Sequence, residues 1–136
     1  LPHGEGDFSH IGRKAGLFVK EKGKTLPDSF RHEQSLVLRT EKGLVILNSC
    51  SHIGVENIIS EVRDAFPDEK IVAYIGGLHL YRSNEADVFS LAETIKNLGI
   101  EKIYTGHCTG DKAFAILKRE LGDCLVQLKV GLEINL

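Results

Sequence analysis

The stretch Gly43-Leu-Val-Ile-Leu-Asn-Ser-Cys-Ser-His-Ile-Gly54 joins an apolar run to a polar turn that contains a histidine. Residues 44–48 are rich in β-forming side chains, which is typical of a buried strand. Directly after the turn, apolar residues recur at 55, 58, 59, 62, 65 and 66, and Pro67 follows. This spacing predicts a helix over residues 55–66. A strand, a histidine-bearing turn and a helix therefore follow one another.

The segments on either side extend this order. Residues 35–40 form a second β-rich run, and Glu41-Lys-Gly43 predicts a short hairpin between the two runs. The later elements are predicted as strands over 70–75, 102–105, 125–130 and 132–136, and as helices over 85–98 and 111–121. A hairpin followed by alternating helices and strands predicts an α/β (α+β layered) domain over residues 35–136. Residues 1–34 are predicted to be an irregular N-terminal segment.

The composition fits a single globular domain and disfavours two kinds of partner. The chain has 136 residues, of which 42% are hydrophobic and 26% charged. Its net charge is −2 and it carries no basic stripe, so we expect no nucleic-acid partner. Its apolar runs are far shorter than the ~20 residues needed to cross a bilayer, so we expect no membrane association.

The cysteine and methionine counts bear on the cellular compartment of the protein and on the nature of its N-terminus. Cys50, Cys108 and Cys124 are an odd number without CxxC spacing, which argues against a disulfide framework and favours the cytoplasm. Cys124 lies in an apolar run and is expected to be a small core residue. The chain has no methionine. We therefore expect Leu1 to be a processed terminus or part of something longer.

Three histidines occupy matching places in the predicted order of elements. His52, His79 and His107 each follow a predicted strand within a few residues. In layered α/β folds, ligands gather beyond the carboxyl ends of the strands. Imidazole is a strong ligand for zinc and iron, and a catalytic zinc typically takes three protein ligands. The pattern predicts a shared metal site, with His52 and His107 closest. The remaining histidines, His3, His10 and His32, are expected to be ordinary surface or core residues.

A thiol-dependent site is the first alternative. Cys50 lies two residues from His52, and Cys108 adjoins His107, so a thiolate–imidazole nucleophile is conceivable. Adjacent loop residues rarely point at each other, and no neighbouring group is placed to orient the base. The sequence therefore favours the metal site over a thiol nucleophile.

Two further segments suggest anion binding. Gly76-Gly77 resembles part of a phosphate loop but lacks the lysine–serine ending. Thr109-Gly-Asp111 begins a helix whose free N–H groups could hold an anion beside His107. An ordinary helix cap explains the same residues equally well.

Four segments resemble the metallo-β-lactamase superfamily, and most closely its branch of metal-dependent hydrolases related to dihydropterin-ribofuranosylaminobenzene-phosphate synthase. They occur in the right order over about residues 32–136: His32-Glu-Gln-Ser-Leu-Val-Leu38, Gly43 to Gly54, Ile75-Gly-Gly-Leu-His-Leu80 and Thr105-Gly-His-Cys-Thr-Gly110. The resemblance implies an αββα sandwich that holds one or two divalent metals, with zinc expected first and iron or manganese as alternatives. It implies metal-ligand roles for His52 and His107, and a metal or substrate contact for His79. It implies no organic cofactor.

The principal motif of that family, His-Xaa-His-Xaa-Asp-His, does not occur in the chain. We therefore expect the chain to be the C-terminal half of the sandwich, with a mixed sheet and helices on one face. The catalytic acid stays unassigned, and Asp111 is the nearest acidic residue. The complete enzyme is expected to hydrolyse a phosphoester or related small molecule, whereas the chain alone should be inactive. A non-catalytic α/β subunit that completes its fold with a partner chain is the alternative.

Half of such a sandwich has helices for only one face of its sheet. The other face would expose an apolar patch larger than soluble monomers usually tolerate. The sequence therefore predicts a homodimer or a complex with the missing N-terminal half.

Overall fold

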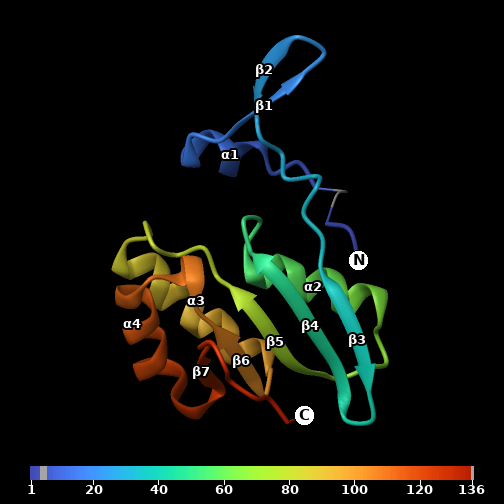
Figure 1. The fold of residues 1–136 in the computed structure, drawn as a ribbon, viewed down its shortest axis with the longest axis vertical. Coiled ribbons are helices and arrows are strands. Elements are labelled where there is room, and N and C mark those ends of the chain that lie inside the picture. The colour runs from blue at the N-terminus through green and yellow to red at the C-terminus, as the bar shows by residue number, and fades with distance from the viewer. Residues whose placement is uncertain (4–5, 136) are drawn as a thin grey trace.

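A five-stranded mixed sheet forms the centre of the computed structural model, which describes residues 1–3 and 6–135 (Figure 1). The strand order is β3-β4-β5-β6-β7, with β3 antiparallel to β4 and the other neighbours parallel. The strands are β3 (Leu36–Thr40), β4 (Gly43–Cys50), β5 (Ile71–Gly77), β6 (Lys102–Thr105) and β7 (Leu125–Gln127). The predicted hairpin and the mixed sheet are both confirmed.

Three helices cover one face of this sheet. They are α2 (Val55–Ala65), α3 (Glu85–Leu98) and α4 (Asp111–Leu121), so the predicted helices are confirmed. Ile58 and Ile59 of α2 are fully buried in one apolar cluster with Ile46 of β4 and Ile103 of β6. Burial of each such side chain contributes about 1.5–3 kcal/mol to folding, so this layer is the main core of the chain.

The hairpin between β3 and β4 depends on a glycine. Gly43 has φ +137°, a conformation that other residues rarely adopt. A Cβ atom at this position would lie 2.4 Å from the carbonyl oxygen of Lys70. Glycine therefore lets the start of β4 approach β5 closely, and it fixes the register of the strand that leads to His52.

The N-terminal segment contains more structure than the sequence predicted. It includes α1 (Ser9–Ala15) and a hairpin of β1 (Phe18–Glu21) with β2 (Lys24–Pro27). The prediction of irregular structure was wrong here, because these elements are short and nearly all of their strand residues are exposed, so no burial pattern marks them. They lie beyond the end of the sheet at which β4 and β5 finish, rather than across its face (Figure 1).

The first residues of the chain are hydrogen-bonded to the segment before β3, whereas the last described residues do not form the predicted strand. At the start, the terminal amine of Leu1 donates to the Ser35 carbonyl at 2.7 Å, and the His3 N–H donates to the Glu33 carbonyl at 3.0 Å. At the other end, β7 finishes at Gln127, earlier than predicted. Residues 132–135 form no strand, so β7 is the edge of the sheet; Leu136 lies outside the described residues. None of the described helices is long and apolar enough to cross a membrane.

Candidate metal centre

The ends of three parallel strands bring the three predicted histidines to one edge of the sheet. His52 follows β4, His79 follows β5, and His107 follows β6 in a single 3₁₀ turn, η1 (His107–Thr109). The rings of His52 and His79 lie 4.5 Å apart between centroids, at an interplanar angle of 56°. Parallel pairing therefore produces the gathering of imidazoles that the strand-end pattern predicts.

Cysteine side chains enter this cluster. Two groups of metal-binding side chains occur among the described residues, and within each group the ligand atoms lie within 4.8 Å of one another. One group is Cys50, His52 and His79, and the other is Cys50, His107 and Cys108. Cys50 belongs to both groups, so the cluster is continuous.

The arrangement of the histidines differs from the prediction in one respect. His52 and His107 were expected to be the closest pair, but the ring contact is between His52 and His79. His107 lies instead beside Cys50 and Cys108. The reason is the strand order: β5, which carries His79, lies between β4 and β6.

Backbone conformations that are rare for residues with side chains concentrate at this edge. Phe30, His79 and His107 have φ values of +54°, +52° and +51°. Each such conformation costs about 1–3 kcal/mol and persists only where the surroundings impose it. Two of the three are the predicted site histidines, and the third stacks on His52. Strain at these positions is typical of a site whose side chains must point in a set direction.

A buried carboxylate that the sequence did not single out orients His52. Glu33 is 7% exposed, and it accepts hydrogen bonds from the backbone N–H groups of His52 at 3.0 Å and Ile53 at 3.1 Å. Its Oε1 also lies 3.3 Å from the Nδ1 atom of His52. A carboxylate at Nδ1 favours the tautomer that leaves Nε2 free as a ligand, as in metal sites with carboxylate–histidine pairs. Glu33 therefore holds both the backbone and the ring of His52 in place.

Aromatic rings enclose the two histidines that are in contact. Phe30 stacks on His52 with ring centroids 5.1 Å apart and the planes 2° from parallel. Tyr81 meets His79 edge-on at 5.4 Å. These contacts hold both imidazoles against rotation, so that little ordering remains to be done when a ligand binds.

His79 is in the state that a metal requires. Burial, and next the neighbouring His52, lower the pKa of His79 below its usual value, which favours the neutral imidazole. Among the described residues, nothing hydrogen-bonds to its buried Nδ1 atom. An unpaired buried nitrogen is costly, and a metal ion or a substrate group would satisfy it. The donor set of imidazole nitrogens and thiols fits a divalent metal such as zinc.

The turn that leads to His52 is tied to β5. Ser51 is buried, and its hydroxyl bonds both to the hydroxyl of Tyr74 and to the Gly77 carbonyl, the latter at 2.7 Å. Burial raises the pKa of Tyr74 to about 12. The neutral phenol is therefore the form that holds the strand and the turn together.

This phenol gives the chain a predictable sensitivity to alkaline pH. Folding raises the pKa of Tyr74 from about 10 to about 12. The contribution of the neutral phenol to the unfolding free energy is therefore fully present below pH 10 and is lost as the pH rises through about 12. At pH 11 the wild type should lose about 1 kcal/mol of unfolding free energy that Tyr74→Phe does not lose. Urea denaturation of both proteins between pH 8 and pH 11 measures the difference. A constant difference across this range would contradict the expectation.

The other residues considered from sequence belong to neither group of the cluster. His3 is buried, where it bonds to the Glu61 carboxylate and, at 2.7 Å, to the Ser35 hydroxyl, while His10 and His32 are exposed. Asp111 is exposed at the first position of α4, and it belongs to neither group of the cluster.

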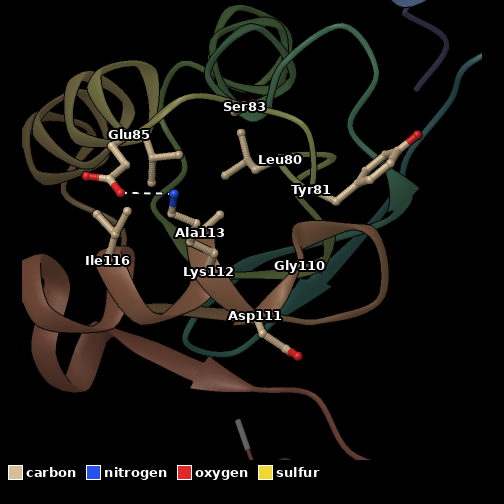
Figure 2. Close-up of a pocket in the computed structure, with 10 residues that line it drawn as sticks. Leu80, Tyr81, Ser83, Glu85, Gly110, Asp111, Lys112, Ala113 and Ile116 are labelled. Atoms are coloured by element: carbon tan, nitrogen blue, oxygen red, sulfur yellow. Dashed lines mark ion pairs between the residues drawn. The ribbon is translucent and has the colours of Figure 1, made fainter.

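The start of α4 borders a separate pocket of about 170 Å³ between α3 and α4 (Figure 2). Lys112 lies across it and pairs with Glu85 at 3.0 Å. None of the clustered histidines lines this pocket. The ion pair leaves this lysine engaged, which weakens the anion-binding interpretation of Thr109-Gly-Asp111.

The Cys108 thiol has the wrong ionisation state for a nucleophile. Burial, and next the neighbouring Cys50, raise the pKa of Cys108 to about 11. A thiol of this kind is protonated at neutral pH, whereas a catalytic cysteine needs a lowered pKa. However, the expectation that these neighbouring loop residues point apart was wrong, because His107 and Cys108 offer ligand atoms to the same group.

No protein-family model matches the chain, but comparison with curated proteins and solved structures finds similar proteins. The chain is 35% identical over 116 residues to 7,8-dihydropterin-6-methyl-4-(beta-D-ribofuranosyl)-aminobenzene-5'-phosphate synthase of Methanocaldococcus jannaschii, which covers 85% of the chain. A solved structure of a metal-dependent hydrolase of the beta-lactamase superfamily superposes with a TM-score of 0.81 at 35% identity over 88% of the chain. The chain spans 40% of the length of the first relative and 46% of the second. In sequence and in fold, the chain belongs to the metallo-β-lactamase superfamily.

Proposed function

We propose that this chain supplies part of the metal centre of a metal-dependent hydrolase that acts on a phosphoester or a related small molecule. The observation that carries the proposal is the cluster of strand-end histidines, with a buried carboxylate on His52 and an unpaired nitrogen on His79. One similar protein is a metal-dependent hydrolase, and the other is a synthase whose name contains a phosphate ester. The first description supports metal-dependent hydrolysis, and the second supports a phosphate-bearing small molecule as the substrate class.

Each residue of the cluster has a distinct part in this proposal. His52, His79 and His107 would hold one or two divalent ions, with zinc expected first and iron or manganese as alternatives. A bound divalent metal would supply Lewis-acid activation of a phosphoryl or carbonyl oxygen. Glu33 fixes the ring of His52. Burial favours the neutral form of His79, whose unpaired Nδ1 nitrogen could then bind a metal. The cytoplasm fits the three free cysteine thiols.

A phosphodiesterase assay on the natural polypeptide that contains this chain tests the proposal. With zinc, iron or manganese added, we expect hydrolysis of bis(p-nitrophenyl) phosphate, and we expect His52→Ala or His107→Ala to lower turnover at least about 100-fold, because metal ligands are lost. His10→Ala is the matched control, since His10 is exposed and outside the cluster. The 136-residue chain alone should show negligible turnover. Activity that survives both histidine substitutions or removal of metal by a chelator would contradict the proposal.

A further inference from the structure

We propose that Cys50, His107 and Cys108 form a sulfur-rich binding site for a thiophilic divalent metal ion such as zinc. Their ligand atoms lie within 4.8 Å of one another. In a tetrahedral zinc site with Zn–S of about 2.3 Å and Zn–N of about 2.0 Å, ligand atoms lie about 3.5–3.8 Å apart. Small side-chain rotations of about 1 Å would close the group on an ion. The inference rests on the proposed metal centre for the location of the ion, but not on hydrolysis.

A glycine in β5 makes room for the two thiols to approach. Cys50 pairs in register with Gly77, and a Cβ atom at Gly77 would lie 2.6 Å from the sulfur of Cys108. Any larger residue at this position would occupy the space between the ends of β4 and β6. The Gly76-Gly77 pair, which the sequence suggested as part of a phosphate loop, therefore has a different use here: it opens the sheet edge to the sulfur atoms.

The turn that carries His107 and Cys108 is held in place before any ion binds. Thr109 is buried, and its hydroxyl accepts the Leu78 N–H at 3.0 Å and bonds to the Thr105 hydroxyl at 2.6 Å. The Cys108 carbonyl accepts the Tyr81 N–H at 3.2 Å. Because the turn is fixed on both sides, the metal-ligand atoms of His107 and Cys108 are already in place and need no ordering when an ion binds. Such pre-ordering of the ligands favours tight metal binding.

Access and chemistry also agree with such a site. His107 is exposed and both thiols are half-buried, so an ion can reach the group from solvent. Metal binding would displace one proton from each thiol to solvent, with no change of oxidation state. Three protein ligands leave one coordination position open, which is the arrangement of catalytic rather than structural zinc sites.

Cobalt(II) binding to the 136-residue chain under reducing conditions tests the inference. Sulfur ligands give cobalt an intense near-ultraviolet charge-transfer band, whereas nitrogen and oxygen ligands do not. We expect this band in the wild type, with about half of its intensity lost in Cys50→Ser or Cys108→Ser and all of it lost in the double variant, because each thiolate contributes one bond. Cys124→Ser is the matched control, since Cys124 is a half-buried thiol outside both groups. Circular dichroism would establish that each variant is folded.

Three outcomes overturn the inference. Cobalt binding without the charge-transfer band would show that the thiols do not bind the metal, and it would be consistent with a metal centre made of imidazoles alone. A band that Cys124→Ser weakens as much as Cys108→Ser would indicate unspecific thiol binding. The absence of any cobalt binding by the folded, reduced chain would exclude the site in this chain, without bearing on the phosphodiesterase activity of the natural polypeptide.

Discussion

Replacing Glu33 with alanine is expected to lower the unfolding free energy by about 3 kcal/mol and to weaken metal binding by about 10- to 100-fold. The carboxylate is buried and accepts the N–H groups of His52 and Ile53, so its removal leaves two backbone donors without their partner. An unpaired buried donor costs about 1–3 kcal/mol, which gives the size of the stability effect. The loss of affinity follows separately, because the His52 ring is no longer held at Nδ1.

The amide variant separates these two effects. Glu33→Gln retains one oxygen acceptor and should lose less stability than the alanine variant, but its amide lacks the charge that favours a proton on Nδ1 of His52. Urea denaturation gives the unfolding free energy, and competition for zinc with a chelating dye gives the affinity. Glu41→Ala is a suitable control, since Glu41 is exposed in the hairpin turn. Wild-type stability and wild-type affinity in Glu33→Ala would show that Glu33 has no positioning role.

The elements with complete local signals were predicted with their correct bounds. The predicted helix over residues 85–98 coincides with α3. At its start, the Asn84 side chain accepts the Asp87 N–H at 2.9 Å, and at its end Gly99 has φ +63°. The strand predicted over residues 132–136 does not form over its described part: its pattern is apolar, but residues 132–135 do not pair with the edge strand β7.

The candidate site was only partly predictable, because its members depend on contacts between distant segments. Strand-end histidines are visible in sequence, since one sheet edge collects them. Glu33 is not, because it lies 19 residues from His52 and nothing local marks its carboxylate as buried. The approach of Cys50 to Cys108 depends in turn on Gly77, a residue of a third strand. Contacts of this kind follow from strand order and register, which a single sequence does not specify.

The sheet face opposite the helices is the second feature with a large expected effect. On the edge strand β3, Leu36 and Leu38 are 58% and 45% exposed, and they pair in register with Leu47 and Val45 of β4. Ile75 and Tyr104 belong to the same smaller cluster as Val45. Val45 itself is buried within the chain, and α1, β1 and β2 lie beyond the end of the sheet rather than across this face (Figure 1). We propose that a second copy of the chain covers it in the purified protein.

Burial of roughly 400 Å² of apolar surface at ~25 cal/mol per Å² would contribute about 10 kcal/mol before the cost of association, and this contribution is what favours the pairing of two copies. We therefore expect the wild-type chain to sediment as a dimer, and Leu36→Lys combined with Leu38→Lys to sediment as a folded monomer. Both leucines are exposed on an edge strand, so lysine should not disturb the core. Leu26→Lys, at a leucine 40% exposed on β2, is the matched control and should remain dimeric. A compact wild-type monomer that binds no hydrophobic dye would contradict the pairing of sheets, because it would show that this face is stable in water.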